Sequence, residues 1–193
     1  MGRSVLDQAC AQARAWQDQG RLLSVAVNVS AVQLRDPEFE AYVEAALTDH
    51  QLDASLLCLE LTESLLIEPQ IDGIGALLNR LAGLGVRIAI DDFGTGYSSL
   101  LNLKRLPVHH IKIDQSFVRG IGCDAESEAI IQATVSLTHS LGKCVTAEGV
   151  ETEAQHRFLV DLGCDQAQGY LYGSPGSADK VLMLAAGFGA AKC

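Results

Sequence analysis

The sequence lacks a long apolar run and a cluster of basic residues, and both absences exclude classes of protein. No stretch reaches the roughly 18 consecutive apolar residues of a membrane span. Arg3, Asp7 and Gln8 interrupt the start of the chain, where a signal peptide needs an apolar segment. The formal net charge of -10 argues against a nucleic-acid groove, which needs a basic stripe. We therefore expect a soluble, cytoplasmic protein whose partner is neither a DNA nor an RNA polymer.

The cysteines also lack the spacing of a metal-binding or disulfide-rich protein. None of the 6 cysteines belongs to a C-x-x-C pair, and none clusters with histidine. In a chain of this size they are predicted to be reduced thiols. A structural zinc site is therefore disfavoured.

Two alternating patterns of apolar residues run along the whole chain. Its 193 residues, 48% of them hydrophobic, suffice for one buried core and are few for two, so we predict a single domain over residues 1–193. Short apolar runs predict strands at 23–29, 56–61, 86–90, 110–113, 144–147 and 166–170. Amphipathic segments predict helices at 5–18, 37–50, 72–84, 127–141, 152–162 and 178–186. This alternation is typical of an α/β fold with a parallel sheet.

A polar residue stands at or near the carboxyl end of each predicted strand. These residues are Asn28, Glu60, Asp91 with Asp92, Lys112 with Asp114, Glu148 and Gln168. Any one of them alone is most simply a helix cap or a hydrogen-bonded polar group. Six strands in succession are better explained by a parallel βα barrel, because the carboxyl ends of its strands meet at one mouth that carries the catalytic groups.

Several carboxylates would then share a small volume: Glu60, Asp91, Asp92 and Glu148. Like charges at close range raise one another's pKa values and destabilise the fold unless a cation lies between them. A single lysine, Lys112, cannot neutralise four carboxylates. Carboxylate oxygens and the amide of Asn28 suit Mg²⁺ or Mn²⁺ better than zinc. The adjacent Asp91 and Asp92 suit two neighbouring ions, which in phosphoryl hydrolysis hold the attacking and leaving oxygens.

The aromatic and histidine side chains are interpreted mainly as structural. Tyr97, Tyr170 and Tyr172 lie near predicted strand ends, where packing is favoured and base stacking is the alternative. The histidines fall mainly on predicted helices or at strand starts, where a structural role is favoured: His50, His109, His110, His139 and His156.

Residues 25–175 resemble the EAL family of cyclic di-GMP phosphodiesterases. The matching segments are VNVS at Val27, ELTES at Glu60, AIDDFGTGYSSL at Ala89, HIKIDQSFV at His110, TAEGVET at Thr146 and QGYLYGSP at Gln168. The specific part is DDFGTGYSSL followed at the right distance by KID and AEGVE. The resemblance implies a TIM-like (β/α) barrel that hydrolyses cyclic di-GMP to the linear dinucleotide 5'-pGpG by attack of a metal-activated water.

The resemblance also implies roles for individual residues. The implied metal ligands, for two ions of Mg²⁺ or Mn²⁺, are Asn28, Glu60, Asp91, Asp92 and Glu148. Lys112 is implied to orient the water or the phosphate. Glu148 is either a ligand or the general base, and the catalytic set is Glu148, Lys112 and Asp92. Residues implied to bind substrate or to support the site are Gln168, Glu63, Glu151 and Asp114, and Glu63 is expected to hold the loop after Asp92.

The same resemblance implies which partners the protein has and which part of the family's domain this sequence contains. Family members commonly dimerise near that loop, so a homodimer is expected, and a GGDEF or sensory domain is expected upstream in the parent protein. The Glu-Ala-Leu motif itself is absent, and the segment from Gly2 resembles the helix that precedes the VNVS strand. We therefore expect about six of eight strands, open sheet edges, and a metal site one ligand short with impaired or no turnover.

Functions of other classes compete with this one. A module that binds cyclic di-GMP or a protein without cleavage is the main alternative, and metal-dependent release of the linear dinucleotide distinguishes it from the enzyme. Asp92-Phe93-Gly94 matches the kinase DFG, but no glycine-rich phosphate loop and no H-R-D motif accompany it. A serine hydrolase is disfavoured because no G-x-S-x-G is present.

Overall fold

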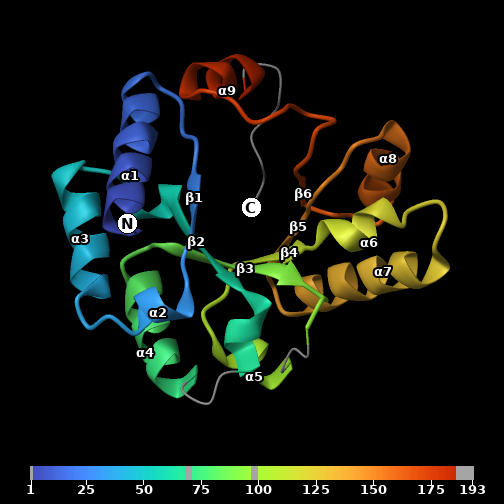
Figure 1. Ribbon diagram of the computed structural model, residues 1–193, viewed down its shortest axis with the longest axis horizontal. Helices are drawn as coiled ribbons and strands as arrows, with labels where there is room; N and C mark the ends of the chain where they lie inside the picture. The colour runs from blue at the N-terminus through green and yellow to red at the C-terminus, as the bar shows by residue number, and fades with distance from the viewer. Residues whose placement is uncertain (1, 68–70, 97–99, 186–193) are drawn as a thin grey trace. The chain divides into compact units, whose positions relative to one another are not determined.

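The structure, a computed structural model, describes residues 2–67, 71–96 and 100–185 (Figure 1). Its strands in these ranges are β1 (Val25–Asn28), β2 (Leu57–Thr62), β3 (Arg87–Phe93), β4 (His110–Ile113), β5 (Cys144–Ala147) and β6 (Gln166–Ala167). Its α-helices are α1 (Gly2–Asp18), α2 (Ala31–Leu34), α3 (Phe39–Asp49), α4 (Ile71–Gly83), α5 (Leu100–Arg105), α6 (Gln115–Arg119), α7 (Ala125–Ser140), α8 (Glu153–Asp161) and α9 (Ala178–Ala185). Two 3₁₀ turns, η1 (Ala54–Leu56) and η2 (Glu63–Ile67), flank β2.

The strands follow one another in the sheet in chain order, β1-β2-β3-β4-β5-β6. β1 pairs with β2, β4 with β5, and β5 with β6, each time in parallel. The register places Asn28 opposite Glu60, and Lys112 opposite Thr146. Helices separate successive strands, as parallel pairing requires. The predicted α/β fold with six strands in the described chain is therefore confirmed.

The chain divides into two compact units. Unit 1 comprises Met1–Ile90 and Gly96–His109, and unit 2 comprises Asp91–Thr95 and His110–Cys193. In unit 1, α1 packs against β1 and lies beside α3 (Figure 1). Cys10 and Ala13 of α1 and Val43 of α3 are completely buried there. The apolar face of each helix thus holds it against its neighbours.

The core of unit 2 fixes the ends of β4 and β5. Ile113 and Val145 from these strands pack with Ile131 of α7 and Leu159 of α8, all almost completely buried. Burying one such side chain contributes about 2 kcal/mol relative to exposure. This apolar packing leaves the residues that follow the two strands in defined positions.

Short elements account for most differences from the predicted helices and strands. The helices at 31–34, 100–105 and 115–119 were not predicted, because each is too short to show a helical repeat. α2 did carry a local signal, since Ser30 and Gln33 form a capping box at its start. β6 contains only two of the five residues predicted for it.

Most cysteines among the described residues carry free thiols. Four thiols are free, as expected, namely Cys10, Cys58, Cys123 and Cys164. Cys144 is disulfide-bonded, so the prediction that all the cysteines are reduced was wrong for this residue. Among the residues that the structure describes, no helix is both long and apolar enough to cross a membrane.

Candidate functional site

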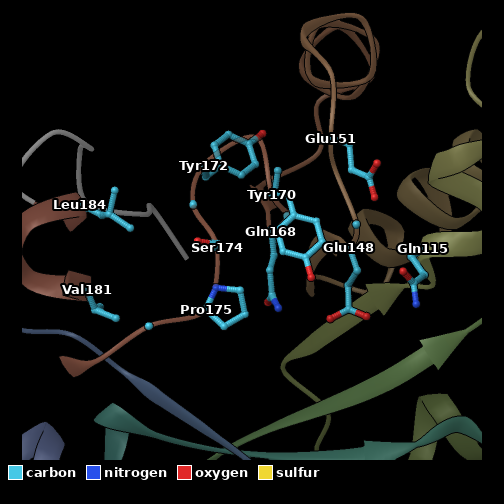
Figure 2. Close-up of a pocket in the computed structure, with 15 residues that line it drawn as sticks. Gln115, Glu148, Glu151, Gln168, Tyr170, Tyr172, Ser174, Pro175, Val181 and Leu184 are labelled. Carbon is cyan, nitrogen blue, oxygen red and sulfur yellow. The ribbon is translucent and has the colours of Figure 1, made fainter. Parts of the chain in front are cut away.

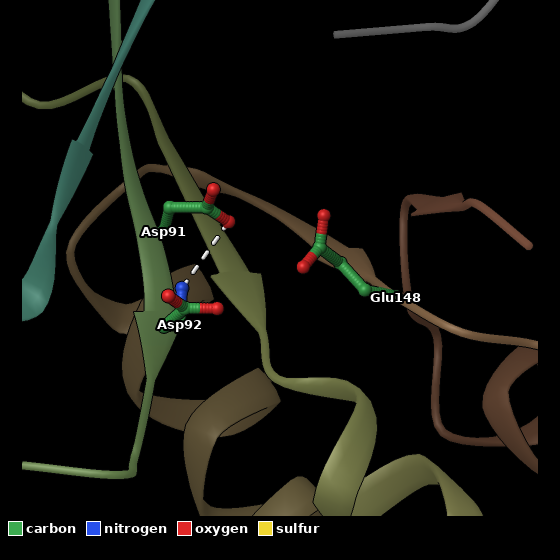
Figure 3. Close-up of side chains that lie close together, drawn as sticks. All are labelled: Asp91, Asp92 and Glu148. Atoms are coloured by element: carbon green, nitrogen blue, oxygen red, sulfur yellow. Dashed lines mark hydrogen bonds between the residues drawn. The ribbon is translucent and has the colours of Figure 1, made fainter. Parts of the chain in front are cut away.

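Three carboxylates meet at the ends of two strands in unit 2. Asp91 and Asp92 lie near the carboxyl end of β3, and Glu148 follows β5 directly. One carboxylate oxygen from each residue lies within 4.8 Å of the others. Asp91 and Glu148 extend toward one another from separate segments, and the Asp92 backbone N–H donates to Oδ1 of Asp91 at 3.2 Å (Figure 3). Oxygen atoms grouped in this way can hold a metal ion.

Lys112 places an ammonium group within this carboxylate cluster of Asp91, Asp92 and Glu148. Its Nζ lies 3.0 Å from Oδ1 of Asp91 and 2.7 Å from Oε1 of Glu148. The Lys112 side chain is only 8% exposed, so water screens these charges weakly. One ammonium against three carboxylates leaves an excess of negative charge, which a divalent cation would neutralise.

Asp92 occupies an unusual backbone conformation beside Asp91. Its φ of 55° lies in the left-handed region, which a non-glycine residue adopts at a cost of about 1 kcal/mol or more. Thr95 stabilises this turn, because its Oγ1 donates to the Asp92 carbonyl oxygen at 2.9 Å. Burial raises the pKa of Asp92, and the negative charges of Asp91 and Asp114 raise it further, while Lys112 opposes them. The turn therefore holds a carboxyl group in a place that is unfavourable for its charge.

Asp114 connects the cluster to helix α6. It is the N-cap of α6, and its side chain accepts the Ser116 backbone N–H at 2.9 Å and the Ser116 hydroxyl. Burial alone would raise the pKa of Asp114, but the hydrogen bonds from Ser116 and from Asp92 lower it. A hydrogen bond between the Asp92 and Asp114 side chains thus links the cluster to the start of α6.

Two of the predicted ligands lie side by side in unit 1. Asn28 ends β1 and is the register partner of Glu60 in β2. Glu60 is 9% exposed, and its carbonyl oxygen accepts the Val29 N–H at 2.9 Å. The pairing of β1 with β2 therefore sets these two side chains next to each other.

Glu63 lies at the start of η2 and contacts the segment that follows β3. Its carboxylate accepts the Gly96 backbone N–H at 3.0 Å, and the side chain is almost completely buried. A Cβ atom added to Gly96 would stand 3.3 Å from the Glu63 carboxyl carbon, so the loop and the carboxylate are in close contact. Tyr97, singled out from the sequence, lies outside the described residues.

A cavity of about 600 Å³ in unit 2 adjoins the cluster, with which it shares Glu148. Figure 2 shows its polar side chains gathered near Glu148 and its apolar side chains on the side of α9. Gln168, Glu151, Tyr170 and Tyr172, all named from the sequence, line it. Lining residues that the sequence did not indicate include Gln115, Ser174, Pro175, Val181 and Leu184. Gln115 directly follows Asp114, whereas Val181 and Leu184 carry no sequence signal beyond a helical repeat.

Backbone hydrogen bonds continue from β5 and β6 into the walls of this cavity. The Gln168 N–H donates to the Ala147 carbonyl oxygen at 2.8 Å, and the Val150 N–H donates to the Gln168 carbonyl oxygen at 3.0 Å. Gly169 is required between them, because a Cβ atom there would lie 2.2 Å from the Val150 carbonyl oxygen. The segments after β5 and β6 are thus held so close that Glu148 and Gln168 face the same space (Figure 2).

Comparison with known proteins identifies what this arrangement is similar to. The profile of the EAL domain family matches residues 1–175. The bifunctional diguanylate cyclase/cyclic di-GMP phosphodiesterase MucR of Pseudomonas aeruginosa is 46% identical over 183 residues, which are 94% of this chain and 27% of that protein. The cyclic di-GMP phosphodiesterase PA2567 of the same species is 42% identical over 172 residues, which are 89% of this chain and 29% of that protein. The chain thus spans less than a third of the length of these relatives.

A solved structure supports the same comparison in three dimensions. The MucR phosphodiesterase of P. aeruginosa, solved as a c-di-GMP complex, superposes with a TM-score of 0.89 at 46% sequence identity. The match covers 93% of this chain and 73% of that chain. The predicted TIM-like barrel fold is confirmed by this likeness.

Proposed function

Because the chain belongs to the EAL domain family, we propose that it hydrolyses cyclic di-GMP to the linear dinucleotide 5'-pGpG by attack of a metal-activated water. The observation that carries the proposal is that Glu148 belongs both to the carboxylate cluster and to the wall of the cavity. A phosphodiester bound in the cavity would therefore lie next to the groups that activate water. We also propose that residues 1–193 act as one EAL-type domain.

The oxygen ligands of the cluster fit a divalent cation. Asp91, Asp92 and Glu148 would hold it, and Mg²⁺ or Mn²⁺ suits these hard ligands. A bound cation supplies a more acidic water and neutralises charge on the phosphate, and two ions are proposed for the complete domain. For Asn28 and Glu60, the role of ligand rests on the family resemblance and stays a prediction.

Other steps of the reaction are assigned to side chains of this chain, which position the reactants and accept a proton. Lys112 directs its ammonium at a phosphate oxygen or at the attacking water, since it already lies between Asp91 and Glu148. Glu148 accepts the proton of that water as general base, or serves as a ligand. The new bond joins the water oxygen to phosphorus, the bond from phosphorus to the 3' oxygen breaks, and the 3' oxygen takes up a proton from solvent to leave as a hydroxyl group. Asp114 supports Asp92, and Glu151 and Gln168 contact the substrate in the cavity.

One assay distinguishes hydrolysis of cyclic di-GMP from binding without cleavage. The purified chain is incubated with cyclic di-GMP and Mg²⁺ or Mn²⁺, and the linear dinucleotide is separated by chromatography. Glu148→Gln is expected to lower the rate by about a hundredfold or more. Glu126→Gln, at an exposed position in the first turn of α7, is the matched control and keeps the wild-type rate.

The sequence leaves impaired or no turnover open, and we propose impaired turnover. Binding of cyclic di-GMP without even a slow metal-dependent release of product would overturn the hydrolase proposal in favour of a binding module. The same assay measures the impaired turnover expected from the sequence. A rate unaffected by Glu148→Gln would remove that carboxylate from the mechanism.

Dimerisation, an upstream GGDEF or sensory domain and a cytoplasmic location stay predictions. For the homodimer, we note that Leu100 and Leu101 are each 56% exposed at the start of α5. Exposed apolar side chains that lie together favour association. Light scattering of the wild type and of Leu100→Ser/Leu101→Ser tests this prediction, and the substituted chain should be monomeric.

A further inference from the structure

His156 on helix α8 contacts a wall of the cavity through Tyr172. Nδ1 of His156 lies 2.8 Å from the Tyr172 hydroxyl oxygen, within hydrogen-bonding distance. The two rings meet edge to face, with centroids 5.8 Å apart and an interplanar angle of 78°. Both a polar and an aromatic interaction therefore fix the orientation of the Tyr172 ring.

The first turn of α8 is itself firmly anchored. Gln155, next to His156, is 8% exposed, and its Nε2 donates to the Val118 carbonyl oxygen at 3.2 Å. Its Oε1 accepts the backbone N–H groups of Glu151 at 2.8 Å and of Thr152 at 3.0 Å. His156 thus projects from a point that is tied to α6 and to the cavity-lining residue Glu151.

Tyr172 belongs to a turn that contributes a large part of the cavity wall. The backbone N–H groups of Tyr172 and Gly173 both donate to the Gly169 carbonyl oxygen, at 3.1 and 3.3 Å. Gly169, Tyr170, Tyr172 and Gly173 all line the cavity. The turn begins two residues after β6, which has only two residues in the sheet. Its shape therefore depends strongly on side-chain contacts such as the one from α8.

We propose that His156 is a positioning residue for the ligand of this cavity. By holding the Tyr172 ring, it keeps the 169–173 turn in the conformation that gives the cavity its shape next to Glu148. His156 is not among the described residues that line the cavity, so it acts through Tyr172. The inference rests on the proposed function, because it takes cyclic di-GMP as that ligand.

A double-mutant cycle tests the inference. Dissociation constants for cyclic di-GMP are measured by calorimetry on the full chain in EDTA, which separates binding from turnover. His156→Leu and Tyr172→Phe are each expected to weaken binding about fivefold, the equivalent of one ordinary hydrogen bond. The double variant should be no weaker than either single variant, because the two changes remove the same interaction. His156→Asn, whose amide can occupy the place of Nδ1, should restore binding to within about twofold.

His139→Leu is the matched control. His139 is a helical histidine of the same unit that hydrogen-bonds to Asp165 at 2.9 Å and does not line the cavity. Its replacement should leave the affinity unchanged. The inference is overturned if the wild type binds cyclic di-GMP and His156→Leu binds it with the same affinity. It is also overturned if the losses of affinity from the two single substitutions add in the double variant. Either result would leave the proposed function intact.

A second measurement keeps the inference testable if the wild-type chain binds no cyclic di-GMP, a result that would count against the proposed function. Amide hydrogen exchange of Leu171, Tyr172 and Gly173 is followed without ligand in the wild type, His156→Leu and His139→Leu. Exchange should become about fivefold faster in His156→Leu alone. Equal exchange in all three proteins would overturn the positioning role.

Discussion

Nζ of Lys112 lies 2.7 Å from Oε1 of Glu148, and these side chains are only 8% and 18% exposed. The same ammonium reaches Asp91 at 3.0 Å, so one positive charge serves two carboxylates from different segments. Partly buried charges of this kind are costly when a partner is removed, because the remaining charge keeps its desolvation penalty without compensation.

Replacement of Lys112 by methionine should therefore destabilise the metal-free chain. The expected loss is about 3 kcal/mol, since Asp91 and Glu148 are left without their shared cation. Urea denaturation in EDTA measures it, and added Mg²⁺ should recover part of the loss. Lys104→Met, at an exposed position of α5, is the control. Equal stability of the two variants would mean that Lys112 does not compensate the cluster.

Because Asp92 has a left-handed conformation, its replacement by glycine is expected to stabilise the fold and to weaken cation binding. Asp92→Gly should raise the free energy of unfolding in EDTA by about 1 kcal/mol, because glycine adopts a φ of 55° without strain. It should also weaken Mn²⁺ binding at least tenfold, since one carboxylate ligand is lost.

Gln51→Gly is the matched control for Asp92→Gly, because Gln51 is also left-handed, with a φ of 50°. It should stabilise the chain to a similar degree and leave Mn²⁺ affinity unchanged. Thermal unfolding and Mn²⁺ titration provide the two readouts. Unaltered Mn²⁺ affinity in Asp92→Gly would remove Asp92 from the set of ligands.

The close approach at Gly169 predicts that even one methyl group disrupts the cavity wall. In Gly169→Ala the Cβ atom would lie 2.2 Å from the Val150 carbonyl oxygen, so the backbone must shift at a cost of about 2 kcal/mol. Affinity for cyclic di-GMP should fall with it. Gly73→Ala on α4 meets no atom within 4 Å and should stabilise the chain by about 1 kcal/mol. A Gly169→Ala chain with wild-type stability would contradict the close contact between Gly169 and the Val150 backbone.

The N-cap of α7 predicts a defined pH dependence. Hydrogen bonds from the Ser127 side chain and the Glu126 backbone lower the pKa of Asp124. Because the folded-state pKa lies below the unfolded value of about 3.9, the cap stabilises the chain fully above that pH and is lost as the pH falls through the folded pKa.

Asp124→Ala should accordingly be less stable than the wild type at pH 7, and the difference should shrink in acid, at a pH well below the unfolded value of about 3.9. Urea midpoints at both pH values measure it. Asp124→Asn keeps a capping oxygen that does not titrate. The difference in stability between Asp124→Asn and Asp124→Ala should therefore be the same at both pH values. A deficit of Asp124→Ala that is the same at both pH values would show that the carboxylate charge is not involved.

The sequence predicted the strands of the sheet and the convergence of their carboxyl ends. The strands at 110–113 and 144–147 agree with the structure residue for residue, because β-branched runs between polar residues give an unambiguous pattern. Asp91, Asp92, Lys112 and Glu148 were singled out by one rule, that the carboxyl ends of parallel strands converge. The structure does bring these four together.

Other features arise from contacts that no local pattern encodes. Val181 and Leu184 line the cavity because of how α9 packs, and their own sequence neighbours give no sign of it. His156 was interpreted as structural because it lies on a predicted helix. Its hydrogen bond to Tyr172, sixteen residues further along the chain, depends on the turn after β6.

The central claim is that the carboxylates of unit 2 bind a divalent cation, and a crystal structure of the chain soaked with Mn²⁺ tests it most directly. We predict an anomalous difference peak at about 2.2 Å from carboxylate oxygens of Asp91, Asp92 and Glu148. A data set at saturating Mn²⁺ with no peak between these three residues, or with peaks only elsewhere, would contradict it.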